Sequence, residues 1–131
     1  MAVDEGGRRK AKHPDSGRWY EGDLPWLWAE ALSISYLAYD MQMAPGKSPT
    51  DGTMDMLLST GHSRYQLIGS LMKVEYGTHI ADAWFYRYKV TELVFTPADP
   101  AHTFYMSGEV IGEPGETVHV KTHPGKALLW F

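Results

Sequence analysis

Turn-forming residues divide this chain of 131 residues into short segments, only one of which has the length and period of a helix. The sequence contains 13 Gly and 8 Pro, together with 5 Trp, 8 Tyr and 4 Phe. Gly and Pro favour turns, and aromatic residues favour strands over helices. A chain of this length is typical of one domain with a modest core. The sequence therefore predicts a mainly β domain.

The one predicted helix covers residues 63–76. Ser63 and Gln66 have the spacing of a capping box at its start. Gly77 follows, at the position where a helix ends in a left-handed residue. An apolar stripe at helical spacing comprises Leu67, Ile68, Leu71, Met72 and Val74. Because this stripe has to be covered, we expect the helix to lie against a sheet or a partner.

Alternation of apolar and polar residues predicts the first two strands. One begins at Leu32, with Ile34 and Tyr36 on the same face. In the other, Met54, Met56 and Leu58 face inward, whereas Asp55 and Ser59 face outward. The connection between them contains several Pro and Gly residues, so it is expected to be a long loop.

The segment 84–96 is rich in aromatic and β-branched residues, but its inward face changes phase between Val90 and Leu93. A bulge near Thr91 and Glu92 would reconcile the two halves. Four shorter strands are expected between Gly- and Pro-containing turns, at His102–Ser107, Glu109–Gly112, Thr117–Lys121 and Ala127–Phe131. Together these elements predict an antiparallel β-sandwich with one flanking α-helix.

Charge divides the chain into two parts. Residues 1–18 carry five basic and three acidic groups and show no apolar period, which predicts a flexible basic arm. Residues 19–131 form the predicted folded lobe and carry seven basic and thirteen acidic groups. Because this lobe is acidic, nucleic acid is not expected as a partner. The basic cluster Arg8-Arg9-Lys10 of the arm is either part of a solvated tail or a contact to anionic lipid or nucleic acid.

The sequence also argues against several kinds of chemistry. It has no Cys, so a disulfide framework and a thiol nucleophile are excluded. His119 and His123 would lie about 13 Å apart along a strand, too far to share a zinc ion, so no metal site is predicted. No nucleophile elbow, P-loop or dinucleotide-binding motif is present. No apolar run suits a membrane span or a secretory signal, so a cytoplasmic location is expected.

Several of these pieces, taken in order, resemble the C-terminal half of the sphingosine kinase and diacylglycerol kinase family of lipid kinases. The resemblance covers roughly residues 19–131, and Tyr76 stands where the related kinases have Lys. The residues that carry it are Ala44-Pro45, Asp51-Gly52-Thr53-Met54-Asp55, Ser63-Arg64, Tyr76-Gly77-Thr78-His79, Lys89-Val90, Leu93-Val94-Phe95-Thr96-Pro97, Ser107-Gly108-Glu109 and His123-Pro124-Gly125.

The resemblance implies a two-lobed enzyme that needs ATP and Mg²⁺, of which this chain is the β-sandwich lobe. The other, N-terminal lobe would carry the phosphate loop and the catalytic acid. Ser107, Gly108 and Glu109 match the D-G-E element that approaches the nucleotide, with Ser in place of Asp. Glu109 would then act near phosphate and magnesium, although a solvated turn residue explains it equally well.

The same resemblance places Leu71, Met72 and His79 along the acyl-chain channel. Burial of Leu71 against the sheet, and a purely structural role for His79, stay open. Asp51-Gly52 matches a family motif, but a simple turn also accounts for it.

The sequence therefore predicts the lipid-binding lobe of an ATP-dependent lipid kinase, inactive alone and not expected to bind ATP or Mg²⁺ tightly by itself. Its substrate would be a sphingoid base or a diacylglycerol. The expected partners are the lipid, the missing N-terminal catalytic lobe and a second copy of the chain, with peripheral contact to membranes. The alternative is a non-catalytic β-sandwich module for an apolar ligand or a protein.

Overall fold

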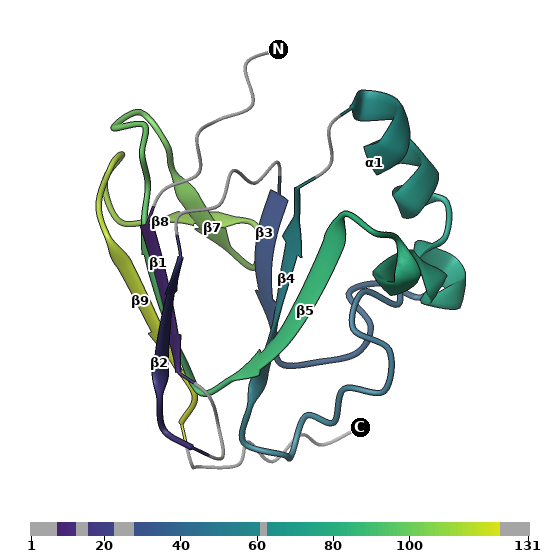
Figure 1. Cartoon of the computed structure of the whole chain (residues 1–131), viewed down its shortest axis with the longest axis horizontal. Helices are drawn as coiled ribbons and strands as arrows, with labels where there is room; N and C mark the ends of the chain where they lie inside the picture. The colour runs from purple at the N-terminus through teal and green to yellow at the C-terminus, as the bar shows by residue number, and fades with distance from the viewer. Residues whose placement is uncertain (1–7, 13–15, 23–27, 61–62, 124–131) are drawn as a thin grey trace.

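The computed structural model describes residues 8–12, 16–22, 28–60 and 63–123. Within them the chain forms short strands, one α-helix and two 3₁₀ helices (Figure 1). In chain order these are β1 (Arg8–Lys12), β2 (Trp19–Gly22), β3 (Trp28–Leu32), β4 (Met54–Ser59), α1 (Arg64–Leu71), η1 (Val74–Tyr76), η2 (Thr78–Ala81), β5 (Phe85–Val90), β6 (Glu92–Thr96), β7 (Phe104–Met106), β8 (Glu109–Ile111) and β9 (Val118–Lys121).

The strands form three antiparallel sheets. Their orders are β2-β1-β6-β9, β3-β4-β5 and the hairpin β7-β8. The β3-β4-β5 sheet stands between the four-stranded sheet on one side and the helical segments on the other (Figure 1). The prediction of a mainly β fold with antiparallel sheets and one flanking α-helix is confirmed.

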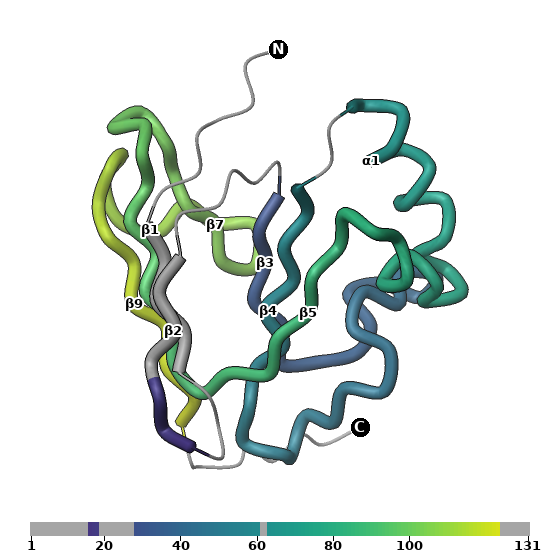
Figure 2. The backbone as a smooth tube through the Cα atoms, in the orientation of Figure 1, coloured from purple at the N-terminus to yellow at the C-terminus, as the bar shows by residue number. Residues whose placement is uncertain are grey.

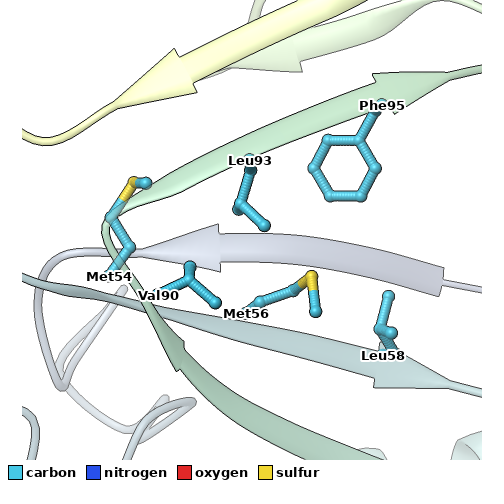
Figure 3. Close-up of a cluster of buried hydrophobic side chains, with 6 residues drawn as sticks. All are labelled: Met54, Met56, Leu58, Val90, Leu93 and Phe95. Carbon is cyan, nitrogen blue, oxygen red and sulfur yellow. The ribbon is translucent and has the colours of Figure 1, made fainter. Parts of the chain in front are cut away.

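Strand β4 is buried on both of its faces. Met54, Met56 and Leu58 pack between the two larger sheets with Val90, Leu93 and Phe95 (Figure 3). Leu57 points the other way. The cluster on that side also contains Leu32, Met43, Ala44 and Val74.

Asp55 and Ser59 face away from the inner core, as predicted, but they do not reach solvent, since both side chains are fully buried. The reason is a third layer: the loop between β3 and β4 and the segments from α1 to η2 lie together on that side of the sheet (Figure 2). We call the outer face of β3-β4-β5, together with these covering segments, the outer layer.

The predicted bulge near Thr91 and Glu92 is wrong. Strand β5 ends at Val90 and pairs with β4, whereas β6 begins at Glu92 and pairs with β1 and β9. Thr91 is therefore the point at which the chain leaves one sheet and enters the other. The change of phase in the sequence comes from this change of sheet.

Two elements have bounds in the structure that differ from the predicted ones. The strand expected from Leu32 to Tyr36 instead spans Trp28–Leu32, and Ile34 and Tyr36 are about half exposed in the loop that follows. The helix ends at Leu71, before two 3₁₀ turns. Gly77 does adopt the expected left-handed conformation, with φ of 65°, but between η1 and η2.

At the N-terminus the sequence predicts an arm over residues 1–18, and the structure has strand β1 within that range. Arg8–Lys12 pairs antiparallel with β2 and β6. The available pairing edge of β6 explains why a segment without apolar periodicity forms a strand. The strand predicted at Ala127–Phe131 lies outside the described residues.

Replacing Leu58 with alanine tests the burial of β4 in the core between the sheets. Leu58 is 1% exposed, so Leu58→Ala should lower the free energy of unfolding by about 2–5 kcal/mol. Leu37, 44% exposed, provides the matched control, and Leu37→Ala should cost less than about 1 kcal/mol. Urea denaturation measures both, and equal losses would contradict the core assignment.

Candidate functional site

The predicted nucleotide-edge residues lie at the tip of the β7-β8 hairpin. Met106 pairs with Glu109, so Ser107 and Gly108 form a two-residue turn. Their φ angles are 52° and 85°, as a type I′ turn requires at both central positions. Phe104 fixes the hairpin to the core, because its ring lies 5.9 Å from that of Phe95.

The backbone geometry of this turn accounts for part of the D-G-E pattern, and that part does not require a bound ligand. Ser107 is the one non-glycine residue with positive φ in the described part of the chain. Aspartate tolerates this left-handed conformation better than most residues, and serine has no such advantage. The turn holds Ser107, Gly108 and Glu109 next to one another and exposed to solvent. The Glu109 side chain and the Ser107-Gly108 turn are therefore accessible at this edge.

Helix α1 begins as the sequence predicts, since the Ser63 hydroxyl accepts a hydrogen bond from the Gln66 amide at 3.2 Å. Its buried residue, however, is Ser70. The Ser70 hydroxyl donates to Asp82 Oδ2 and accepts from the indole of Trp84 at 2.9 Å. Asp82 also pairs with Lys73. Polar contacts, rather than an apolar stripe, therefore attach this helix to the domain.

The expected apolar stripe of α1 is consequently not a core face. Leu71 and Met72 are 40% and 76% exposed at the C-terminal end of the helix. Ile68 is more than half exposed, whereas Val74, in η1, is buried. Two of the three predicted substrate residues thus present apolar surface outside the domain core.

His79 is the third predicted substrate residue, and it is completely buried in η2. Its Nε2 atom lies 3.1 Å from the carbonyl oxygen of Met43, which makes Nε2 the donor. Its ring packs edge to face on Phe85, with centroids 5.3 Å apart. Burial lowers the pKa of His79, and this effect outweighs the bond to Met43, which acts to raise it. The imidazole is therefore held neutral, with Nδ1 free to accept a hydrogen bond.

The outer face of the sheet also carries an ion pair that sequence reasoning missed. Asp55 is fully buried, and Arg87 donates from Nε to Asp55 Oδ2 at 2.7 Å. The available signal was an acidic residue in the middle of an otherwise apolar strand, Met54 to Leu58. Buried charges are rarely tolerated without a partner, so this position should have indicated one.

A second charged group closes the loop before β4. The buried Lys47 ammonium donates to Asp51 and Thr53, and Lys89 pairs with Asp51 from β5. Burial acts to raise the pKa of Asp51, but these hydrogen bonds outweigh it and hold the pKa below its ordinary value. Asp51-Gly52 is thus a bonded turn, as the simpler interpretation of the sequence expects.

The part of the chain that the structure describes has no group of three or more acidic or histidine side chains able to hold a metal ion. Magnesium prefers six oxygen ligands in octahedral geometry. The exposed Glu109 alone does not meet that requirement, so these residues do not make a complete magnesium site. No helix within the same residues is long and apolar enough to cross a bilayer.

Comparison with protein families identifies the domain. Residues 27–129 match the family described as the YegS C-terminal NAD kinase beta sandwich-like domain. The chain belongs to this family. It is the C-terminal lobe of the diacylglycerol kinase and YegS type of lipid kinase. Membership implies ATP and Mg²⁺ for the complete enzyme. No match was found among curated proteins.

Replacing Arg87 should lower the free energy of unfolding of this lobe far more than replacing Lys89. Arg87→Leu leaves the buried Asp55 carboxylate unpaired, which should cost about 3–5 kcal/mol of unfolding free energy. The exposed Lys89–Asp51 pair is worth less than about 1 kcal/mol, so Lys89→Leu is the control. Chemical denaturation distinguishes them, and a small effect of Arg87→Leu would show that the ion pair is dispensable.

Stability should fall on acidification because of His79. Its pKa in the folded lobe is below the ordinary 6.5, so the unfolded chain takes up a proton first. The contribution of His79 is therefore complete above pH 6.5 and is lost as the pH falls from there toward the lowered folded pKa.

The measurement compares unfolding free energies at about pH 7.5 and about pH 5.5 for the wild type and His79→Gln. The wild type should lose more stability than the variant, and NMR titration should give a His79 pKa below 6.5. Equal losses in the two proteins would contradict a neutral buried imidazole.

Proposed function

We propose that this lobe binds the lipid substrate of a sphingosine kinase- or diacylglycerol kinase-like enzyme and does not turn over by itself. The observation that carries the proposal is the inverted burial of α1, which buries Ser70 and exposes Leu71 and Met72. A helix attached through polar bonds leaves its apolar side chains available to a hydrocarbon chain. His79 and the rest of the outer layer lie next to it, because η2 contacts both α1 and β5.

Catalysis is assigned to the other lobe of the complete enzyme. Phosphoryl transfer to a lipid hydroxyl depends on positioning of the phosphates and on neutralisation of their charge. This sequence contains no phosphate-binding loop, and its described residues lack a metal-binding cluster. We therefore expect no ATP-dependent turnover and no tight binding of ATP or Mg²⁺ by the chain alone.

The β7-β8 hairpin is the part of the lobe that we assign to the nucleotide side. Ser107, Gly108 and Glu109 are exposed at its tip, where the second lobe could contact them. The Glu109 carboxylate would lie near the phosphates and magnesium of the bound nucleotide. Ser107 offers only a hydroxyl where the family pattern has a carboxylate, so its contribution would be weaker.

The exposed apolar end of α1 also supports peripheral contact with a membrane surface from the cytoplasm. The same kind of surface promotes self-association, so a homo-oligomer is expected in the absence of the second lobe. Light scattering of the purified chain that shows only monomer at high concentration would count against this.

A non-catalytic binding module is the second candidate, favoured by Ser107 in place of Asp. The two candidates differ in what accompanies the lobe. A preceding coding segment with a G-G-D-G-T-type loop would support the kinase, and a stand-alone domain would support the module.

Substitution of Met72 tests lipid binding. Met72→Asp places a charge in the proposed hydrocarbon contact and should weaken sphingosine or diacylglycerol binding by about tenfold or more. Met106 in β7 is a matched control, because it is 61% exposed and lies outside the outer layer. Met106→Asp should bind lipid as the wild type does.

Calorimetric titration of the folded chain measures these affinities, and an ATPase assay accompanies it. Absence of lipid binding by the wild type, or equal loss in both variants, would overturn the lipid-binding role. Turnover of ATP at ordinary enzyme rates would overturn the expected inactivity.

A further inference from the structure

The buried polar atoms without a hydrogen-bond partner in the described residues all belong to the outer layer. Buried polar atoms in folded proteins are almost always bonded, so their common location calls for an explanation. These atoms belong to residues of β3, β4, the loop between them and η2. They are Glu30 Oε2, Ser35 Oγ, Asp55 Oδ1 and His79 Nδ1.

Glu30 projects from β3 into this layer. Its neighbours Ala29 and Ala31 pack between the two sheets, whereas Trp28 and Leu32 pack in the outer cluster. Because successive side chains of a strand point to opposite faces, Glu30 shares the face of Trp28 and Leu32. Burial raises the pKa of its carboxyl group, which shows that an isolated negative charge is unfavourable there.

Asp55 projects from the adjacent strand onto the same face. Glu30 is paired with Leu57 across the strands, and Asp55 with Leu32. The two carboxyl groups are therefore diagonal neighbours, with Cα atoms about 7–8 Å apart by sheet geometry. Arg87 occupies Asp55 Oδ2 and leaves Oδ1 as a buried acceptor. Both free oxygens therefore belong to the same face of the β3-β4 pair.

Four basic side chains on this side of the sheet are already paired with carboxylates other than that of Glu30. Within the described residues, neither lysine nor arginine forms an ion pair with Glu30, so its carboxyl group has no cationic partner there. The pairs are Lys47–Asp51, Lys89–Asp51, Lys73–Asp82 and Arg87–Asp55. An ammonium group would supply a cationic partner for Glu30 together with up to three hydrogen-bond donors.

We propose that Glu30 Oε2 and Asp55 Oδ1 bind the ammonium group of a long-chain amine. This inference rests on the proposed lipid-binding role and narrows it: the lobe selects amino lipids of the sphingoid-base type over diacylglycerol. A diacylglycerol offers a single hydroxyl donor and no charge, so it leaves the Glu30 carboxylate uncompensated.

Three probes with the same hydrocarbon chain test the selection: octadecylamine, octadecanol and stearic acid. Each is delivered from cyclodextrin to the full chain and followed by calorimetry. Octadecylamine should bind about tenfold or more tightly than octadecanol, and stearic acid should bind most weakly. Glu30→Gln keeps the shape of the side chain and should remove the preference for the amine over the alcohol.

Glu75, exposed in η1, provides the matched control, and Glu75→Gln should retain the preference. Equal affinity for amine and alcohol, or a preference that survives Glu30→Gln, would overturn the ammonium site but leave lipid binding intact. Failure of all three probes to bind would overturn the proposed lipid-binding role, and the ammonium site with it.

Discussion

Burial of β4 on both faces is the constraint on which the rest of this domain depends. A strand covered on one side only would need apolar residues at alternate positions, yet β4 has six buried residues in succession. The inner set forms the sandwich core with β5 and β6. The outer set requires a cover, which the β3-β4 loop and the helical segments provide. The outer layer thus follows directly from the composition of one strand.

That cover is built differently from the core. Between the sheets the contacts are apolar, whereas α1 is attached through Ser70, Asp82 and Trp84. Polar attachment leaves the apolar end of the helix exposed and places a neutral histidine beside it. Asp55 and Glu30 add buried acceptors to the same layer. A layer that combines exposed apolar surface with buried acceptors suits an amphiphilic ligand better than it suits a stable core.

Local patterns in the sequence were sufficient for the fold class and for the features set by neighbouring residues. The capping of α1 by Ser63 and the Ser107-Gly108 turn are of this kind, because each depends on three or four consecutive residues. The sheet change at Thr91 could not be predicted, since a bulge and a change of sheet produce the same shift of phase. The exposure of Leu71 and Met72 likewise depends on the bonds of Ser70, which link residues far apart in the sequence. The sequence could therefore indicate the helix and the turn that carry the predicted site residues, but not whether those residues are buried. The buried acceptors of Asp55 and Glu30 could not be predicted, because their burial depends on the segments that cover the sheet.

The central claim is that a lipid enters the outer layer and leaves the core between the sheets undisturbed. Methionine methyl NMR tests it directly, because Met43 and Met72 belong to the helical side and Met54 and Met56 to the inner core. On titration with sphingosine, the methyl signals of Met43 and Met72 should shift while those of Met54 and Met56 stay in place. Shifts confined to Met54 and Met56, or no shift at any of the four, would contradict the account.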